Sequence, residues 1–147
     1  MDPLLALLVT AGIAAATALI GLVWRARDGR GRRGDGGRVT AGSLGLASTA
    51  FGSEGTLLQF STEMCARCPG ARRALRGVAD EHDGVLHAEV DLTHHPELAT
   101  RFGILQTPTT LVLDRHGIVR TRIGGLPRRE EVERAVHALS APRSRSS

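Results

Sequence analysis

Two cysteines, Cys65 and Cys68, stand two residues apart in the stretch CARC, and this chain of 147 residues has no other cysteine. A pair at this spacing can supply two of the four ligands of a zinc site, close a short structural disulfide, or exchange disulfides with another molecule. The residues around the pair must distinguish these three kinds of chemistry.

A zinc site would need about four ligands, so other metal-binding side chains should lie nearby. The nearest histidines along the chain do not show the paired spacing of a zinc finger, and we expect no metal; they are His82, His87, His94 and His95. A structural disulfide across so short a loop would remove little entropy from the unfolded chain. Disulfide exchange is favoured because a thiolate is stabilised at the start of a helix.

A strand is predicted before the cysteine pair and a helix after it. Residues 56–60 (TLLQF) form a short apolar strand candidate. Residues 69–82 carry apolar side chains at helical spacing, namely Ala71, Ala74, Leu75, Val78 and Ala79. The pair therefore lies at a strand-to-helix junction.

The remaining pattern alternates between strands and helices. Alternation, turn residues and proline positions predict strands at 85–91, 109–114 and 118–123 and helices at 95–103 and 127–139. From residue 56 the order is β-α-β-α-β-β-α, and its first crossover implies a parallel pair of strands. This order predicts an α/β fold with a mixed sheet and helices on both of its faces.

With this order, the segment 54–140 resembles a thioredoxin-like domain. The resemblance rests on the strand LLQF that leads to CARC, on Asp91 at the end of the next strand, and on QTPTTLVLD with Pro108. It implies a cis bond between Thr107 and Pro108 beside the cysteine pair. It also implies that Cys65 is the nucleophile, that Cys68 is the resolving thiol, and that no cofactor is needed.

Several positions depart from the pattern of the family. Gln59 stands where the family often has a buried acid that helps proton transfer, and an amide cannot take a proton. Met64 replaces the usual aromatic residue before the motif. Pro69 follows the second cysteine, so the regular helix is expected to begin there, with a weaker dipole effect on Cys65.

Two charged residues close to the motif have two interpretations each. Arg67 lies between the cysteines, where a cation would stabilise the thiolate and make the couple more oxidising, or it is a solvated surface charge. Glu63 is either a nearby base or a solvated acid. The predicted supporting or substrate-binding residues are Thr107, Pro108, Arg67, Met64 and Gln59.

An uncharged run precedes this domain. Residues 4–24 contain no charge and are long enough to span the apolar core of a bilayer, about 30 Å thick. Trp24 closes the run and Arg25 and Arg27 follow it, as is typical of a helix end at a membrane interface. We expect a transmembrane anchor at 1–25, with a cleaved signal peptide as the alternative.

Positive charge is concentrated next to this run. Residues 25–38 carry six arginines against two aspartates, whereas residues 54–140 carry 11 arginines against 12 acidic residues. A nucleic-acid module would place its positive charge on the folded part, so we exclude that class. We expect 26–53 to be a Gly/Arg-rich flexible linker, whose stretch 38–55 wraps the domain edge through Leu44, Leu46 and Phe51, and 141–147 to be a disordered tail.

The expected function is that of a membrane-anchored thiol-disulfide oxidoreductase that reduces protein disulfides with electrons from an unidentified donor. The arginines that follow the apolar run favour a cytoplasmic domain, whereas many tethered relatives face outward. The alternatives are a redox-impaired binding or adaptor module, a redox-sensing switch, and an outward-facing disulfide oxidant or isomerase.

Overall fold

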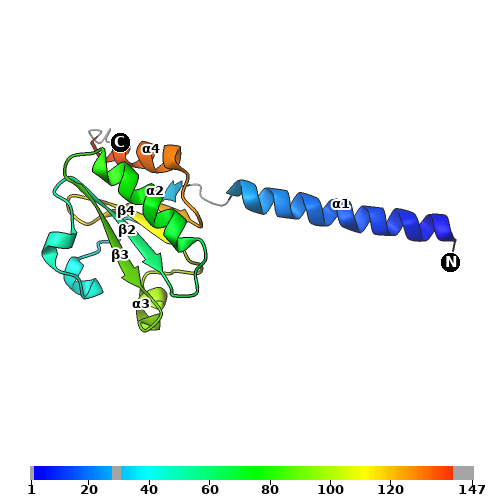
Figure 1. Cartoon of the computed structure of the whole chain (residues 1–147), viewed down its shortest axis with the longest axis horizontal. Helices are drawn as coiled ribbons and strands as arrows, with labels where there is room; N and C mark the ends of the chain where they lie inside the picture. Colours follow the sequence, from blue (N-terminus) through cyan, green and yellow to red (C-terminus); the bar gives the residue numbers. More distant parts are fainter. Residues whose placement is uncertain (1, 28–30, 141–147) are drawn as a thin grey trace.

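A computed structural model of the chain describes residues 2–27 and 31–140, and five strands in it form one mixed sheet (Figure 1). The strand order is β1-β5-β4-β2-β3. The bounds are β1 Gly31–Arg33, β2 Gly55–Ser61, β3 Val85–Asp91, β4 Thr109–Asp114 and β5 Val119–Gly124. The predicted tail at 141–147 lies outside the described residues.

Strand β2 lies inside the sheet and sets its geometry. It pairs in parallel with β3 and antiparallel with β4, and all seven of its residues are buried. An apolar strand that is covered on both faces reads as a nearly continuous hydrophobic run, which agrees with the sequence TLLQF. The antiparallel pairing places the carboxyl end of β2 beside the start of β4.

Helices cover both faces of the sheet, as predicted. Helices α2 (Cys68–Asp80) and α4 (Arg129–Ser140) pack on one face over a core that includes Leu57, Leu75, Val112 and Val132. Helix α3 (Pro96–Arg101) and two short 3₁₀ turns, Ala41–Leu44 and Ser48–Ala50, belong to the other face. The core there includes Leu58, Phe60, Val90, Leu98 and Leu111. Fully burying such a side chain contributes about 1.5–3 kcal/mol.

The structure differs from the flexible linker expected at 26–53. Strand β1 pairs antiparallel with β5, and the chain stays against β5 through the bridge between Arg38 and Ile118. Gly34 shows why glycine is needed here, because a Cβ atom on it would lie 2.3 Å from the carbonyl oxygen of Val119. Gly34, in a segment whose composition suggests flexibility, therefore permits the close approach of two backbones.

The stretch after β1 closes one side of the domain, as expected. Leu44 is buried, and Leu46 and Phe51 pack against the same core. Val39 is also buried, at 3% exposure. Residues 39–51 thus form part of the folded domain and protect the α3 face of the sheet from solvent.

Helix α1 (Pro3–Arg27) contains the uncharged run. Its segment Pro3–Ala26 is long and apolar enough to cross a membrane by length and composition, and its best window is not buried against the rest of the chain. Figure 1 shows the helix running away from the domain on the side where β1 lies. This arrangement agrees with the predicted anchor, and a signal sequence would have the same composition.

Candidate redox site

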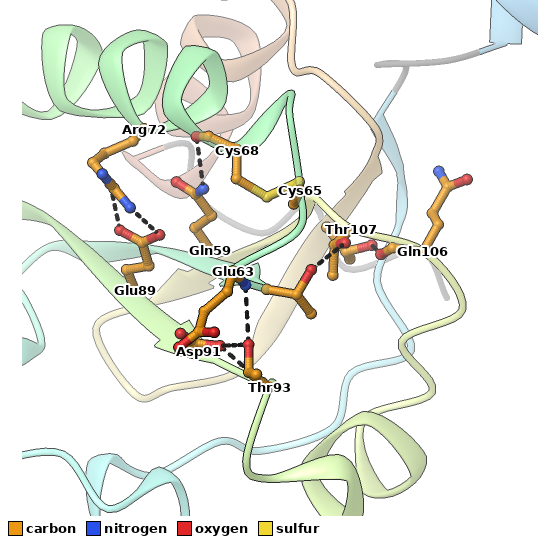
Figure 2. Close-up of a disulfide and its surroundings, with 12 residues drawn as sticks. Gln59, Glu63, Cys65, Cys68, Arg72, Glu89, Asp91, Thr93, Gln106 and Thr107 are labelled. Carbon is orange, nitrogen blue, oxygen red and sulfur yellow. Dashed lines mark hydrogen bonds and ion pairs between the residues drawn. A yellow bond between two sulfur atoms is a disulfide. The ribbon is translucent and has the colours of Figure 1, made fainter.

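The two cysteines form a disulfide at the junction between β2 and α2 (Figure 2). Cys68 is 2% exposed, whereas Cys65 is partly exposed. Two turns precede the helix, since the Cys65 N–H donates to the Thr62 carbonyl and the Cys68 N–H donates to the Cys65 carbonyl. Helix α2 begins at Cys68, one residue before the predicted start, so Cys65 lies outside the helix.

A second loop lies beside the disulfide. The bond between Thr107 and Pro108 is cis, as the resemblance implies. The hydroxyls of Thr62 and Thr107 are 3.3 Å apart and within hydrogen-bonding distance, which joins this loop to the cysteine loop. The Pro108 carbonyl accepts a hydrogen bond of 2.8 Å from the Gly125 N–H, which fixes its other side to the end of β5. The pairing of β2 with β4 brings the two loops together.

Comparisons with known proteins agree with this geometry. The chain is 32% identical over 54 residues to a thioredoxin of Methanocaldococcus jannaschii, a match that covers 36% of the chain and 64% of that protein's length. The chain therefore spans less than two thirds of this relative. No protein-family model matches the chain.

Two solved thioredoxin structures share the fold. Spinach chloroplast thioredoxin f in its long form superposes with a TM-score of 0.56 at 21% identity, covering 71% of this chain and 85% of that one. A mutant thioredoxin from Halobacterium salinarum superposes with a TM-score of 0.55 at 16% identity, covering 62% of this chain and 79% of that one. The domain therefore has a thioredoxin-like fold. The fold class predicted from the sequence is confirmed.

Gln59 connects the centre of the thioredoxin-like sheet to the cysteine pair. It is fully buried, its Nε2 group donates to the Cys68 carbonyl at 3.1 Å, and its Oε1 atom lies 3.1 Å from His87 Nε2. Because a carbonyl oxygen only accepts, the imidazole must carry its proton on Nε2 in this contact. Gln59 therefore holds the first turn of α2 in place and offers no site for a proton.

A cleft of about 460 Å³ opens beside the disulfide. Its charged lining residues are three acids and one arginine: Glu63, Glu89, Asp91 and Arg72. Arg72 binds Glu89 through two hydrogen bonds, of 2.6 and 2.7 Å (Figure 2). The cleft that both cysteines line therefore has an excess of negative charge. The sequence alone did not reveal this cleft, because Arg72 and Glu89 lie on different elements.

Two acids of the cleft, Glu89 and Asp91, have pKa values below those of free carboxyl groups. Burial alone would raise the pKa of Glu89, but hydrogen bonds from Arg72 and Ser61 and the charge of Arg72 lower it overall. Hydrogen bonds from the hydroxyl and the N–H of Thr93 lower the pKa of Asp91. Both carboxylates thus keep their negative charge at neutral pH.

Exposed apolar side chains lie in the cysteine loop, in the loop that leads to Pro108 and after β5. Met64 is 94% exposed immediately before Cys65, and Leu105 is 97% exposed in the loop that leads to Pro108. Leu126, at 44% exposure, lies close to Gly70 in the first turn of α2. Met64 was predicted as a supporting residue, whereas Leu105 was missed, although an isolated leucine in the loop before Pro108 was visible in the sequence.

The sequence also singled out Arg67 and several histidines. Arg67 is exposed at the residue that precedes α2. The histidines considered as metal ligands are distributed over different contacts: His82 lies against His137, His94 near Glu63, and His95 near Glu97. Among the described residues, no three or more His, Cys, Asp or Glu side chains are arranged so that they could hold a metal ion.

The pKa of His87 gives the domain a specific pH dependence. Desolvation by burial lowers this pKa to about 4, with Arg76 and Arg72 contributing and Glu89 opposing. The unfolded chain therefore binds a proton between about pH 6.5 and 4 that the folded chain does not, so stability must fall as the pH falls through this window. We expect a loss of about 2 kcal/mol, after allowance for partial exposure.

His87→Gln tests this prediction because glutamine can still donate to Gln59 but does not titrate. Denaturant unfolding at pH 7 and at pH 4.5 should show a smaller difference between the two conditions for this variant than for the natural chain. The exposed His116 offers the matched control, His116→Gln, which should retain the full difference. An unchanged pH dependence in His87→Gln would contradict the prediction.

Proposed function

We propose that this chain is a membrane-anchored thiol-disulfide oxidoreductase that reduces disulfide bonds in proteins. The observation that carries the proposal is the Cys65–Cys68 disulfide, in which Cys65 is partly exposed and Cys68 is buried, beside the cis bond at Pro108. An accessible thiol is suited to attack another molecule, and a buried partner thiol is suited to resolve the intermediate.

In the proposed reaction the reduced pair acts in two exchange steps. The Cys65 thiolate attacks one sulfur of the substrate disulfide, a mixed disulfide forms, and the other substrate sulfur leaves as a thiolate. Cys68 then loses its proton and attacks Cys65, which releases the second substrate thiolate and leaves the Cys65–Cys68 disulfide. Two electrons have passed from the cysteine pair to the substrate, and a donor must supply them again.

The surroundings of the pair favour the reducing direction. A couple is a stronger reductant when its thiolate form is less stabilised. Cys65 lies three residues before α2, where the dipole of the helix acts more weakly than in its first turn. Glu63, Glu89 and Asp91 outnumber Arg72 in the lining of the cleft, and negative charge disfavours a thiolate. Gln59 supplies no proton acceptor, so water in the open cleft is the proposed proton route.

The membrane assignment rests on α1. We propose that residues 1–25 anchor the chain in a membrane by a single pass and that residues 54–140 carry the reaction. The arginine excess after the helix supports a cytoplasmic position of the domain by the positive-inside rule. Reduction of protein disulfides also suits a compartment where thiols are kept reduced.

The exchange mechanism predicts that Cys68→Ser traps substrates. With no resolving thiol, the mixed disulfide on Cys65 should persist and appear as a covalent adduct on non-reducing gels that disappears on reduction. Cys65→Ser is the matched control and should form no adduct, because its buried Cys68 is not accessible. A partner that binds the Cys68→Ser chain without a covalent bond would instead favour an adaptor module.

The acidic cleft predicts the reduction potential. We expect the full chain to have a potential near the roughly −270 mV of thioredoxin, whereas about −120 to −180 mV would identify an oxidant or isomerase. Glu89→Gln removes a negative charge and releases Arg72 from its partner, so it should raise the potential by roughly 10–30 mV. Asp80→Asn, an exposed acid at the end of α2, should leave it unchanged.

The exposed apolar residues predict a preference for protein substrates. Met64→Ser and Leu105→Ser should each lower kcat/KM for reduction of insulin by about fivefold, mainly through KM, because apolar surface is no longer buried on binding. Reduction of the small disulfide dithiobis(nitrobenzoic acid) should not change. Leu86→Ser on β3 is the control, since Leu86 is 43% exposed and does not line the cleft. Equal effects on both substrates would argue against the role of these residues.

A further inference from the structure

A second cavity lies between the segment that follows β1, the end of α3 and strands β4 and β5. It has a volume of about 460 Å³ and contains three arginines, Arg38, Arg101 and Arg122, against a single acid, Asp35. The remaining lining consists of Gly37, Val39, Thr100, Phe102, Gly103, Leu111 and Val119. This cavity shares no residue with the cleft beside the disulfide.

Two of the arginines have no acidic partner. Arg38 and Arg101 are exposed and form no ion pair within residues 2–27 and 31–140, although Arg101 stacks over the ring of Phe102. Arg122 is fixed in place by the carbonyls of Phe102 and Gly103, at 2.9 and 3.3 Å, and lies 3.9 Å from Asp35. The cavity therefore has a net positive charge and one preorganised guanidinium group.

The strand pairing adds more positive charge at the same edge. Arg32 of β1 stands directly opposite Arg122 of β5 and shares its face of the sheet, whereas Arg33 pairs with Thr121 and lies on the other face. Like charges at directly opposed positions of an antiparallel pair destabilise the pair. An anion bound between Arg32 and Arg122 would remove this repulsion and stabilise the pairing of β1 with β5. Anion binding would therefore explain why two arginines stand opposite each other.

The short connection between α1 and β1 indicates which anion this cavity would meet. Helix α1 ends at Arg27 and β1 begins at Gly31, so three residues separate them. The Cα atoms of Arg27 and Gly31 can be no more than about 14 Å apart, even along a fully extended chain. If α1 spans a membrane, β1 must lie close to the headgroup layer, and a domain on so short a connection meets lipid phosphates at high local concentration.

We propose that the cavity lined by Arg38, Arg101 and Arg122 binds the headgroup of an anionic phospholipid and holds the β1–β5 edge of the domain against the membrane. This proposal rests on the proposed anchor and is independent of the redox reaction. A free phosphate offers the same chemistry, but the short connection from α1 favours the lipid.

The test is amide hydrogen exchange of the full chain in nanodiscs, one set of phosphatidylcholine alone and one set with a third of the lipid replaced by phosphatidylglycerol. The amides of residues 31–39 and 99–104 should exchange roughly tenfold more slowly in the anionic nanodiscs. About 0.5 M NaCl should abolish the difference, since it screens the charges. The double variant Arg38→Gln and Arg101→Gln should also lose it.

The matched control is the double variant Arg73→Gln and Arg76→Gln, which removes the same charge from α2 and should keep the protection. Equal exchange in both kinds of nanodisc would overturn the lipid site. Equal protection by 10 mM inorganic phosphate in phosphatidylcholine nanodiscs would overturn the choice of lipid. A chain that does not enter nanodiscs would contradict the anchor itself, while disulfide reduction by the detergent-solubilised chain reports separately on the redox function.

Discussion

The pairing of β2 with a parallel neighbour on one side and an antiparallel neighbour on the other is the constraint on which the site depends. The parallel pairing with β3 requires a crossover through α2, so the cysteine loop must follow the carboxyl end of β2. The antiparallel pairing with β4 places the loop of Pro108 at the same end of the sheet. If the pairing with β4 were parallel instead, the loop of Pro108 would lie at the opposite end of the sheet from the cysteine loop.

Gln59 connects β2 to the cysteine pair through a hydrogen bond. Its side chain is the fully buried polar group that links β2 to both Cys68 and His87. A buried amide must satisfy its donors and acceptors, since each unpaired group costs about 1–3 kcal/mol. The position of α2 and the tautomer of His87 are therefore coupled. An amide in this place cannot take the proton that leaves Cys68 in the proposed reaction, so solvent in the open cleft is the proposed acceptor.

The sequence was sufficient to predict those features that depend on local pattern. Periodicity predicted the order of strands and helices from residue 56, and proline chemistry predicted the helix start near Pro69. The resemblance implied the cis bond at Pro108. A single sequence does not show which strands lie side by side. Features that depend on residues far apart in the chain were therefore missed, namely the pair of Arg72 and Glu89, the contact of His87 with Gln59 and the position of Leu105. The edge strand β1 was missed because its glycines and arginines lack the alternation of a strand.

Strand β1 also covers an edge of the sheet that would otherwise be exposed. Without it, β5 would expose unpaired backbone groups, and an exposed edge can pair with another chain. β1 covers β5, is only three residues long, and carries Arg32 and Arg33, so the new edge is short and charged. The segment that connects the domain to α1 is thus part of the sheet. Any force that orients this segment at a membrane also orients the domain, because β1 and β5 share one set of backbone hydrogen bonds and move together.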